Sequence, residues 1–292
     1  MENTLSDALR IKVCAFQKNE ITEHYIYRRL AQCIKHPENS KVLDKIAEDE
    51  YRHYEFWKKY THSEVKPGWW QVFKYYWISR LFGITFGIKL MERGEQSAQE
   101  IYRQIGEHLP GVTEILHDED RHEHELINMI DEERLKYVGS IVLGLNDALV
   151  ELTGTLAGLT FALQNTRLIA LAGLITGIAA SFSMAASEYL STKAEEGGRN
   201  PLKSSVYTGI AYILTVLFLV FPYLLLGNYF FCLLVTIINA LMVIAGFNYY
   251  VSVAKGLSFR RRFVEMASIS MGVAAFSFVI GYLIRIFLGI DV

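Results

Sequence analysis

Hydrophobic and polar positions divide the chain of 292 residues into two unlike halves. Up to about Lys136, apolar residues recur at helical spacing among dense charges, which predicts amphipathic helices. After Tyr137 charges become sparse, and the apolar runs are long enough to cross a bilayer, at roughly 20 residues each. The pattern therefore predicts an all-α protein, with an amphipathic helical domain at residues 1–136 and a membrane domain at residues 137–292.

Proline and glycine divide the first half into four predicted helices, at residues 6–34, 40–60, 69–108 and 112–136. Pro37, Pro67-Gly68 and Pro110-Gly111 mark the breaks, since a proline disfavours the helical conformation of the residue before it. Short connections favour antiparallel neighbours, so we expect a four-helix bundle. The third helix is rich in aromatic residues and carries regular basic residues, which suits a bundle helix. Contact of this face with the membrane surface or with a partner subunit is the alternative.

The second half is expected to cross the membrane five times, at residues 138–163, 168–190, 206–226, 229–253 and 263–288. Basic residues gather in the loops after the second and fourth spans, at Lys193, Arg199, Lys203, Lys255, Arg260, Arg261 and Arg262. Such loops stay on the cytosolic side, which places the first domain in the cytosol. The N-terminal residues are polar and do not resemble a secretory signal, in agreement with that orientation. We therefore expect a multi-pass protein of a prokaryotic inner membrane.

Composition removes several classes of function. The formal net charge is −2 and no basic tract is present, so the sequence gives no reason to expect nucleic-acid binding. The three cysteines, Cys14, Cys33 and Cys232, are isolated from one another. Without a Cys-x-x-Cys pair, a zinc ribbon or a rubredoxin-type iron site is excluded, and no disulfide framework is indicated.

Two lone glutamates alternate with two Glu-x-x-His pairs along the four predicted helices. The candidate ligands are Glu20, Glu50, His53, Glu95, Glu119 and His122, with Glu92 as a further candidate one turn before Glu95. Residues three apart share a helix face, so each Glu-x-x-His pair can point into the bundle. Four carboxylates would neutralise two divalent ions, and carboxylate with imidazole suits iron or manganese. This is the ligand pattern of a di-iron carboxylate site in a four-helix bundle.

The first half resembles rubrerythrin and the wider ferritin-like family over roughly residues 5–136. Glu20, Glu50, His53, Glu95, Glu119 and His122 fall on the ligand positions of that family. Tyr27 and Tyr102 follow the lone glutamates by seven residues and are candidate hydrogen-bond donors behind the ligands. A full rubrerythrin also carries a rubredoxin-like domain with four cysteines. This chain has none, which argues against electron delivery for peroxide reduction.

Polar residues within the expected spans point to a second site. Asp147 and Glu151 share one face of the first span, and Met184 and Glu188 share one face of the second. Intramembrane carboxylates are costly, and with a thioether they suit a transiently bound divalent transition metal. Gly-x-x-x-Gly spacings at 154–158 and 173–177 allow close helix approach, either between subunits or within one subunit.

Two segments resemble the first two spans of the vacuolar iron transporter family, GLNDALVELTGTLAGL and SFSMAASEYLSTKAE. On that resemblance, Asp147, Met184 and Glu188 match positions of the metal pathway. The resemblance implies a homodimer with the ion path between its subunits, moving ferrous iron or manganese out of the cytosol against protons. Plant-type members carry a cytosolic metal-binding insert between spans two and three, and the corresponding link is short here.

The leading hypothesis is therefore an exporter that moves iron or manganese out of the cytosol by proton antiport. Its cytosolic di-iron bundle would capture, sense or oxidise the metal. The alternative from another class is a membrane-anchored di-iron oxidase or peroxidase without transport. A metal sensor that controls a pore is a third reading. Polar pairs within two spans favour transport, because a mere anchor has no need of them.

Overall fold

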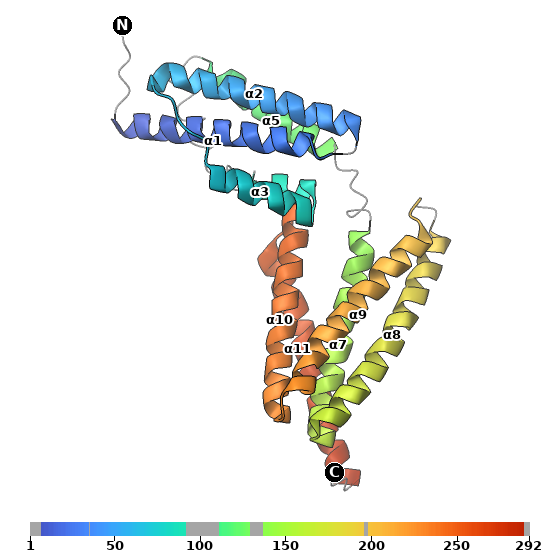
Figure 1. Cartoon of the computed structure of the whole chain (residues 1–292). Coiled ribbons are helices and arrows are strands. Elements are labelled where there is room, and N and C mark those ends of the chain that lie inside the picture. The colour runs from blue at the N-terminus through green and yellow to red at the C-terminus, as the bar shows by residue number, and fades with distance from the viewer. Residues whose placement is uncertain (1–6, 35, 92–110, 129–136, 196–197, 289–292) are drawn as a thin grey trace. The chain divides into compact units, whose positions relative to one another are not determined.

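The computed structural model describes residues 7–34, 36–91, 111–128, 137–195 and 198–288, which are helical with short turns and contain no strand. The prediction of an all-α protein is confirmed. The chain divides into two compact units, Met1–Glu132 and Glu133–Val292 (Figure 1).

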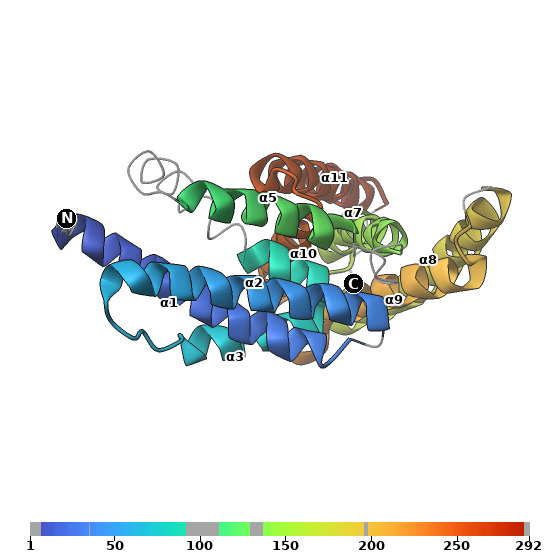
Figure 2. The ribbon, with the colours of Figure 1, turned by 90° about the horizontal axis from the view of Figure 1, so that it is seen from above.

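The first unit is built on a pair of long antiparallel helices, α1 (Asp7–Ala31) and α2 (Pro37–Thr61). Figures 1 and 2 show these two helices side by side. The shorter α3 (Trp69–Phe82) packs on α1, and α5 (Val112–Asn128) packs on α2. Apolar side chains cluster at both ends of the helix pair, one cluster around Leu30 and Ile46 and the other around Trp57.

Helix α2 begins three residues earlier than the sequence predicted. Pro37 occupies its first turn, where a proline needs no backbone hydrogen bond and its fixed φ suits the helix. Ser40, where the second helix was predicted to begin, donates its hydroxyl to the Ala31 carbonyl at the end of α1. The serine thus ties the two helices together at their connection.

The third predicted helix is not continuous, so the expectation of one helix over residues 69–108 was wrong. Helix α3 ends at Phe82, and Gly83 has a φ of 103°, which favours glycine. A new helical stretch starts at residue 84 and is described as far as residue 91. Gly87 lies directly against Ser79, a contact that a straight helix eight residues long could not make. The two glycines therefore allow the chain to fold back on α3.

Among its described residues, the second unit contains five helices that are long and apolar enough to span a membrane. They are α7 (Val138–Leu163), α8 (Thr166–Ala194), α9 (Pro201–Leu225), α10 (Tyr229–Ala254) and α11 (Phe259–Leu288). The predicted five apolar helices are thus confirmed. Helices α8 and α9 begin earlier than predicted, because the side chains of Asn165 and Asn200 cap them by accepting backbone hydrogen bonds.

Helix α7 lies at the centre of this unit and contacts each of the other four spans. Its glycines explain the close packing. A Cβ at Gly154 or Gly158 would meet α11, and one at Gly173 of α8 would meet Leu156 of α7. A Cβ at Gly177 would meet Val216 of α9. Both Gly-x-x-x-Gly spacings therefore serve helix packing within one subunit.

Candidate functional site

Three helices of the first unit bring their acidic and histidine side chains to one buried point. Helix α1 supplies Glu20, α2 supplies Glu50 and His53, and α5 supplies Glu119. One ligand atom from each of these four residues lies within 4.8 Å of the others. Donors bound to one first-row ion at about 2.1 Å lie about 3–4 Å apart, so small side-chain movements would suffice to enclose an ion.

His53 occupies the middle of this group. Its Nδ1 lies 3.5 Å from Glu20 Oε2, 3.5 Å from Glu50 Oε2 and 3.3 Å from Glu119 Oε1. Three carboxylates from three helices thus converge on one imidazole nitrogen. Charged groups of this kind are expensive to bury together unless a cation or protons compensate them.

Glu50 lies between two histidines. Its second oxygen, Oε1, is 3.2 Å from Nδ1 of His122, the other histidine of the predicted set. The two imidazole rings are 5.9 Å apart, centroid to centroid. His122 and Glu50 are 2% and 1% exposed, so solvent does not screen this arrangement. The two carboxylate oxygens of Glu50 therefore face Nδ1 of one histidine each.

The inward atoms fit bound metal. Nδ1 of His53, Nδ1 of His122 and Oε2 of Glu50 are buried and have no hydrogen-bond partner with acceptable geometry among the described residues. Buried polar atoms are rarely left in that state without a reason. Carboxylate and imidazole donors of this kind suit iron or manganese, and the residues therefore fit the predicted metal centre.

The pKa values of the group also indicate a site that favours bound cations. Burial disfavours the charged form of His53, but the carboxylates of Glu119, Glu20 and Glu50 outweigh burial and raise its pKa above the usual range. Burial likewise opposes charge on His122, yet Glu50 raises its pKa to about 9. The pKa of Glu50 rises to about 8 through burial and the nearby charge of Glu119. In the metal-free site, bound protons therefore compensate the negative charges of the carboxylates. Metal binding must release these protons.

Two aspartates that the sequence analysis did not single out fix the outer side of both rings. Nε2 of His122 lies 3.0 Å from Asp49 Oδ2, and Nε2 of His53 lies 3.3 Å from Asp118 Oδ2. Each aspartate serves the histidine of the opposite helix. A proton on Nε2 then donates to the carboxylate and leaves Nδ1 free to bind metal, the usual support of metal-binding histidines.

Arginines complete this outer layer. Arg121 contacts Asp49 at 2.8 Å and Asp118 at 2.6 Å, and Arg52 contacts Asp49. Burial opposes ionisation of Asp49, but hydrogen bonds from His122 and Arg52 outweigh it and lower the pKa of the carboxyl group. The same holds for Asp118, where His53 and the charge of Arg121 outweigh burial and lower the pKa. Both aspartates thus remain ionised behind the histidines.

A repeated pentapeptide was the signal that could have revealed these residues. Residues 49–53 read Asp-Glu-Tyr-Arg-His and residues 118–122 read Asp-Glu-Asp-Arg-His. The sequence analysis considered the Glu-x-x-His pairs and did not single out the aspartate and the arginine beside them. Trp57 was missed as well, although its Nε1–H donates to Glu20 Oε1 at 3.1 Å.

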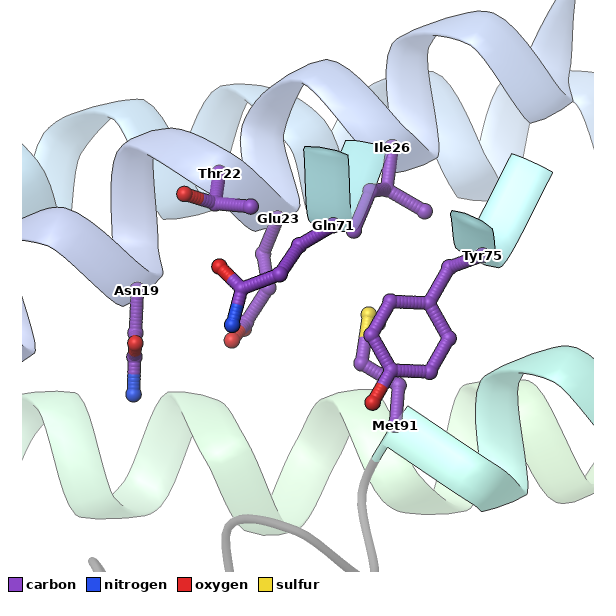
Figure 3. Close-up of a pocket in the computed structure, with 7 residues that line it drawn as sticks. All are labelled: Asn19, Thr22, Glu23, Ile26, Gln71, Tyr75 and Met91. Carbon is purple, nitrogen blue, oxygen red and sulfur yellow. The ribbon is translucent and has the colours of Figure 1, made fainter. Parts of the chain in front are cut away.

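Several predicted residues take other positions or are not described. Glu92, Glu95 and Tyr102 lie outside the described residues. Tyr27 is buried in the apolar cluster with Leu30. A cavity of about 110 Å³ lies beside α1 and is lined in part by Thr22, Glu23, Gln71, Tyr75 and Met91 (Figure 3). Figure 3 shows the Gln71 and Glu23 side chains extending into the same space, which includes none of the predicted ligands.

In the second unit, polar side chains hold two of the predicted pathway carboxylates. The hydroxyl of Tyr212 on α9 donates to Glu151 Oε2 at 2.7 Å. Glu188 of α8 is 7% exposed, and its Oε1 accepts hydrogen bonds from Ser140 at 2.6 Å and from Thr192 at 3.3 Å. The carboxylates of α7 and α8 thus have different neighbours within one subunit.

Asp147 and Met184 complete the predicted pathway set. Asp147 is half-buried on α7, and Met184 packs against the apolar core of the second unit from α8. All four predicted residues, Asp147, Glu151, Met184 and Glu188, lie on α7 and α8. A family model matches the same part of the chain.

The VIT family model matches residues 138–197. This segment covers α7 and α8, the first two of the five candidate spans. The match and the apolar helices indicate a multi-pass membrane protein that transports metal ions. No curated protein matches the sequence.

Proposed function

We propose that this protein exports ferrous iron or manganese from the cytosol and that its first unit binds the same metals in a di-metal centre. The observation that carries the proposal is the VIT family match at residues 138–197 in a chain with five candidate membrane spans. The buried group of glutamates and histidines in the first unit supports the choice of metal, because carboxylate with imidazole suits iron and manganese.

In this proposal, Glu20, Glu50, His53, Glu119 and His122 hold the metals of the first unit, with Glu95 as the remaining predicted ligand and Glu92 as a further candidate. An iron pair bound there would supply redox or storage chemistry. Asp49 and Asp118 would keep Nε2 of each histidine protonated, which would leave both Nδ1 atoms available to bind metal. Glu50 has one carboxylate oxygen near Nδ1 of each histidine and would therefore bind metal together with both of them.

The cargo ion then crosses the membrane along Asp147, Glu151, Met184 and Glu188 of a homodimer. Binding needs ionised carboxylates, so a proton that reaches them from the far side displaces the ion. This exchange makes proton antiport the natural driving reaction. Tyr212 and Ser140 hold Glu151 and Glu188 by hydrogen bonds that must weaken when an ion binds. The orientation predicted from the basic loops places the first unit in the cytosol of a prokaryotic cell.

Flux in proteoliposomes tests the proposal. Full-length protein is reconstituted, and uptake of Fe²⁺ or Mn²⁺ is followed with and without a pH gradient. Asp147→Asn should abolish the flux and leave metal binding by the first unit unchanged. Glu195→Gln is the matched control, because it also converts a carboxylate to an amide but lies at the exposed end of α8, where it pairs with Arg199.

The rival function gives the opposite result. A membrane-anchored oxidase or peroxidase would show no flux in the unmutated protein, together with rapid iron oxidation that depends on oxygen or peroxide. That outcome would overturn the exporter. Flux that persists unchanged in Asp147→Asn would leave transport standing but remove this residue from the path.

A further inference from the structure

Helix α3 carries a row of exposed aromatic and aliphatic side chains. Trp70, Phe73, Trp77 and Leu81 are 74%, 51%, 48% and 63% exposed and follow one another at spacings of three or four residues. Such spacing places them on one face of the helix, here called the α3 stripe. The rings of Trp70 and Phe73 stack at 6.1 Å, and Trp77 continues the row at 6.2 Å from Phe73. A soluble surface rarely exposes so many large apolar groups together.

The charges beside the α3 stripe have a single sign. Lys74 and Arg80 are exposed on α3, and the sequence of this helix, WWQVFKYYWISRLF, contains no acidic residue. Arg29 of α1 adds a guanidinium over the ring of Trp69, 5.6 Å from its centroid. Aromatic rings bordered by cations are typical of helices that lie in the headgroup region of a membrane.

A lipid surface suits the α3 stripe better than a second copy of the chain does. In a two-fold symmetric contact the same patch of both copies meets, so Lys74 and Arg80 of both copies would come together without a carboxylate on either α3 helix. Anionic headgroups complement these charges. The surface is also within reach, because only residues 129–137 separate α5 from the first span. A fully extended chain of that length covers about 35 Å at most.

We propose that the α3 stripe docks on the surface of the membrane that the same chain spans. The tryptophan rings would lie at headgroup depth, with Lys74 and Arg80 on anionic phosphates. The proposal stands on the exposed side chains and charges of α3 and does not depend on transport. It gives the first unit a second attachment to the bilayer, in addition to the chain connection.

Tryptophan fluorescence of the full-length protein can test this docking. The four tryptophans are Trp57, Trp69, Trp70 and Trp77, so all lie in the first unit and three lie on α3. Trp57 is fully buried. The protein is reconstituted in vesicles of phosphatidylcholine and phosphatidylglycerol, with the phosphatidylcholine brominated near the headgroup end of its chains. Bromine quenches on contact, so the docked α3 stripe should lose roughly half or more of the emission relative to unbrominated vesicles.

Variants separate docking from mere proximity. Replacing Trp69, Trp70 and Trp77 by Phe leaves only Trp57, whose emission should be insensitive to bromine. Lys74→Gln with Arg80→Gln should lower the docked-to-free ratio roughly 30-fold, since each cation near an anionic surface contributes about a factor of five. Lys12→Gln with Lys41→Gln removes the same charge from exposed positions of α1 and α2 and should leave quenching unchanged.

Two results would overturn the proposal. Red-shifted emission without quenching would mean that the α3 stripe is solvated. Blue-shifted emission that bromine does not quench, and that shifts to the red as protein is diluted in lipid, would mean that a second copy covers it.

Discussion

Asp49 offers a direct test of how the metal centre is supported. Its Oδ2 accepts a hydrogen bond from Nε2 of His122 at 3.0 Å, and the residue is 5% exposed. Asp49→Asn keeps the size of the side chain and one acceptor oxygen but removes the negative charge. We expect metal affinity to fall, because a neutral amide no longer strengthens the imidazole as a ligand.

The size of the effect can be bounded in two ways. Loss of an outer partner of this kind typically costs about 10–100-fold in affinity, or about 1.4–2.8 kcal/mol. The hydrogen bond, the imidazole ring and a metal bond together place the carboxylate about 7 Å from a divalent ion, which gives roughly 5 kcal/mol of attraction at an effective dielectric of about 20. Arg52 and Arg121 contact the same carboxylate and cancel part of this attraction. The empirical range is therefore the one to expect.

The assay is an Mn²⁺ titration of the full-length protein after chelation, in competition with a fluorescent chelator. Asp120→Asn is the matched control, since it removes the same charge from α5 at an exposed position beside Glu119. Equal affinities for the two variants, within about two-fold, would refute a supporting role for Asp49. Helix content measured by circular dichroism must match the unmutated protein, so that loss of affinity is not loss of fold.

Three further predictions concern stability and packing. Metal-free protein should lose stability of its first unit as pH rises from about 5 to 9. The folded-state pKa values of Glu50 and His122 are raised to about 8 and about 9, so the folded state holds protons that the unfolded state releases. Thermal unfolding, followed by tryptophan emission at several pH values, measures this loss of stability. An unfolding temperature that stays constant or rises with pH would contradict the prediction. Trp57→Phe should cost about 1–3 kcal/mol, because it leaves a buried carboxylate oxygen of α1 without its donor, and the same unfolding assay reports it. Gly144→Ala should destabilise the second unit by about 1–3 kcal/mol, since the added Cβ would strike a backbone carbonyl of α9. Gly246→Ala is the control and should have little effect, because the space around Gly246 is open. Heating in detergent followed by gel filtration compares the stabilities of the two variants.

Periodicity and apolar length were sufficient to predict the helices that carry the site. The span predicted at residues 138–163 has the same bounds as α7. A long apolar run interrupted by few charges is typical of a membrane-spanning helix. Glu50 with His53, and Glu119 with His122, were expected to share helix faces, and these side chains do meet in the first unit. That they bind metal remains a prediction.

Features that depend on tertiary contact were not predictable in the same way. The break at Gly83 is a single residue in a long apolar pattern. Only the contact between Gly87 and Ser79 shows that the chain folds back at this point. The Gly-x-x-x-Gly spacings allowed packing between subunits or within one, and the neighbours of Gly154 on α11 decide for the latter. In each case spacing defines a face, but the partner of that face comes from elsewhere in the chain.

The repeated pentapeptide shows why the contacts of Asp49 and Asp118 with the histidines were not predictable from the sequence. Within one helix, Asp49 precedes His53 by four residues, and this spacing alone suggests that aspartate and histidine of the same repeat would pair. In the structure the pairing is crossed, with Asp49 on His122 and Asp118 on His53. Crossing follows from the packing of α2 against α5, which turns each aspartate toward the histidine of the other helix. The two helices therefore complete each other's ligands, so a change that separates α2 from α5 should impair both metal positions at once.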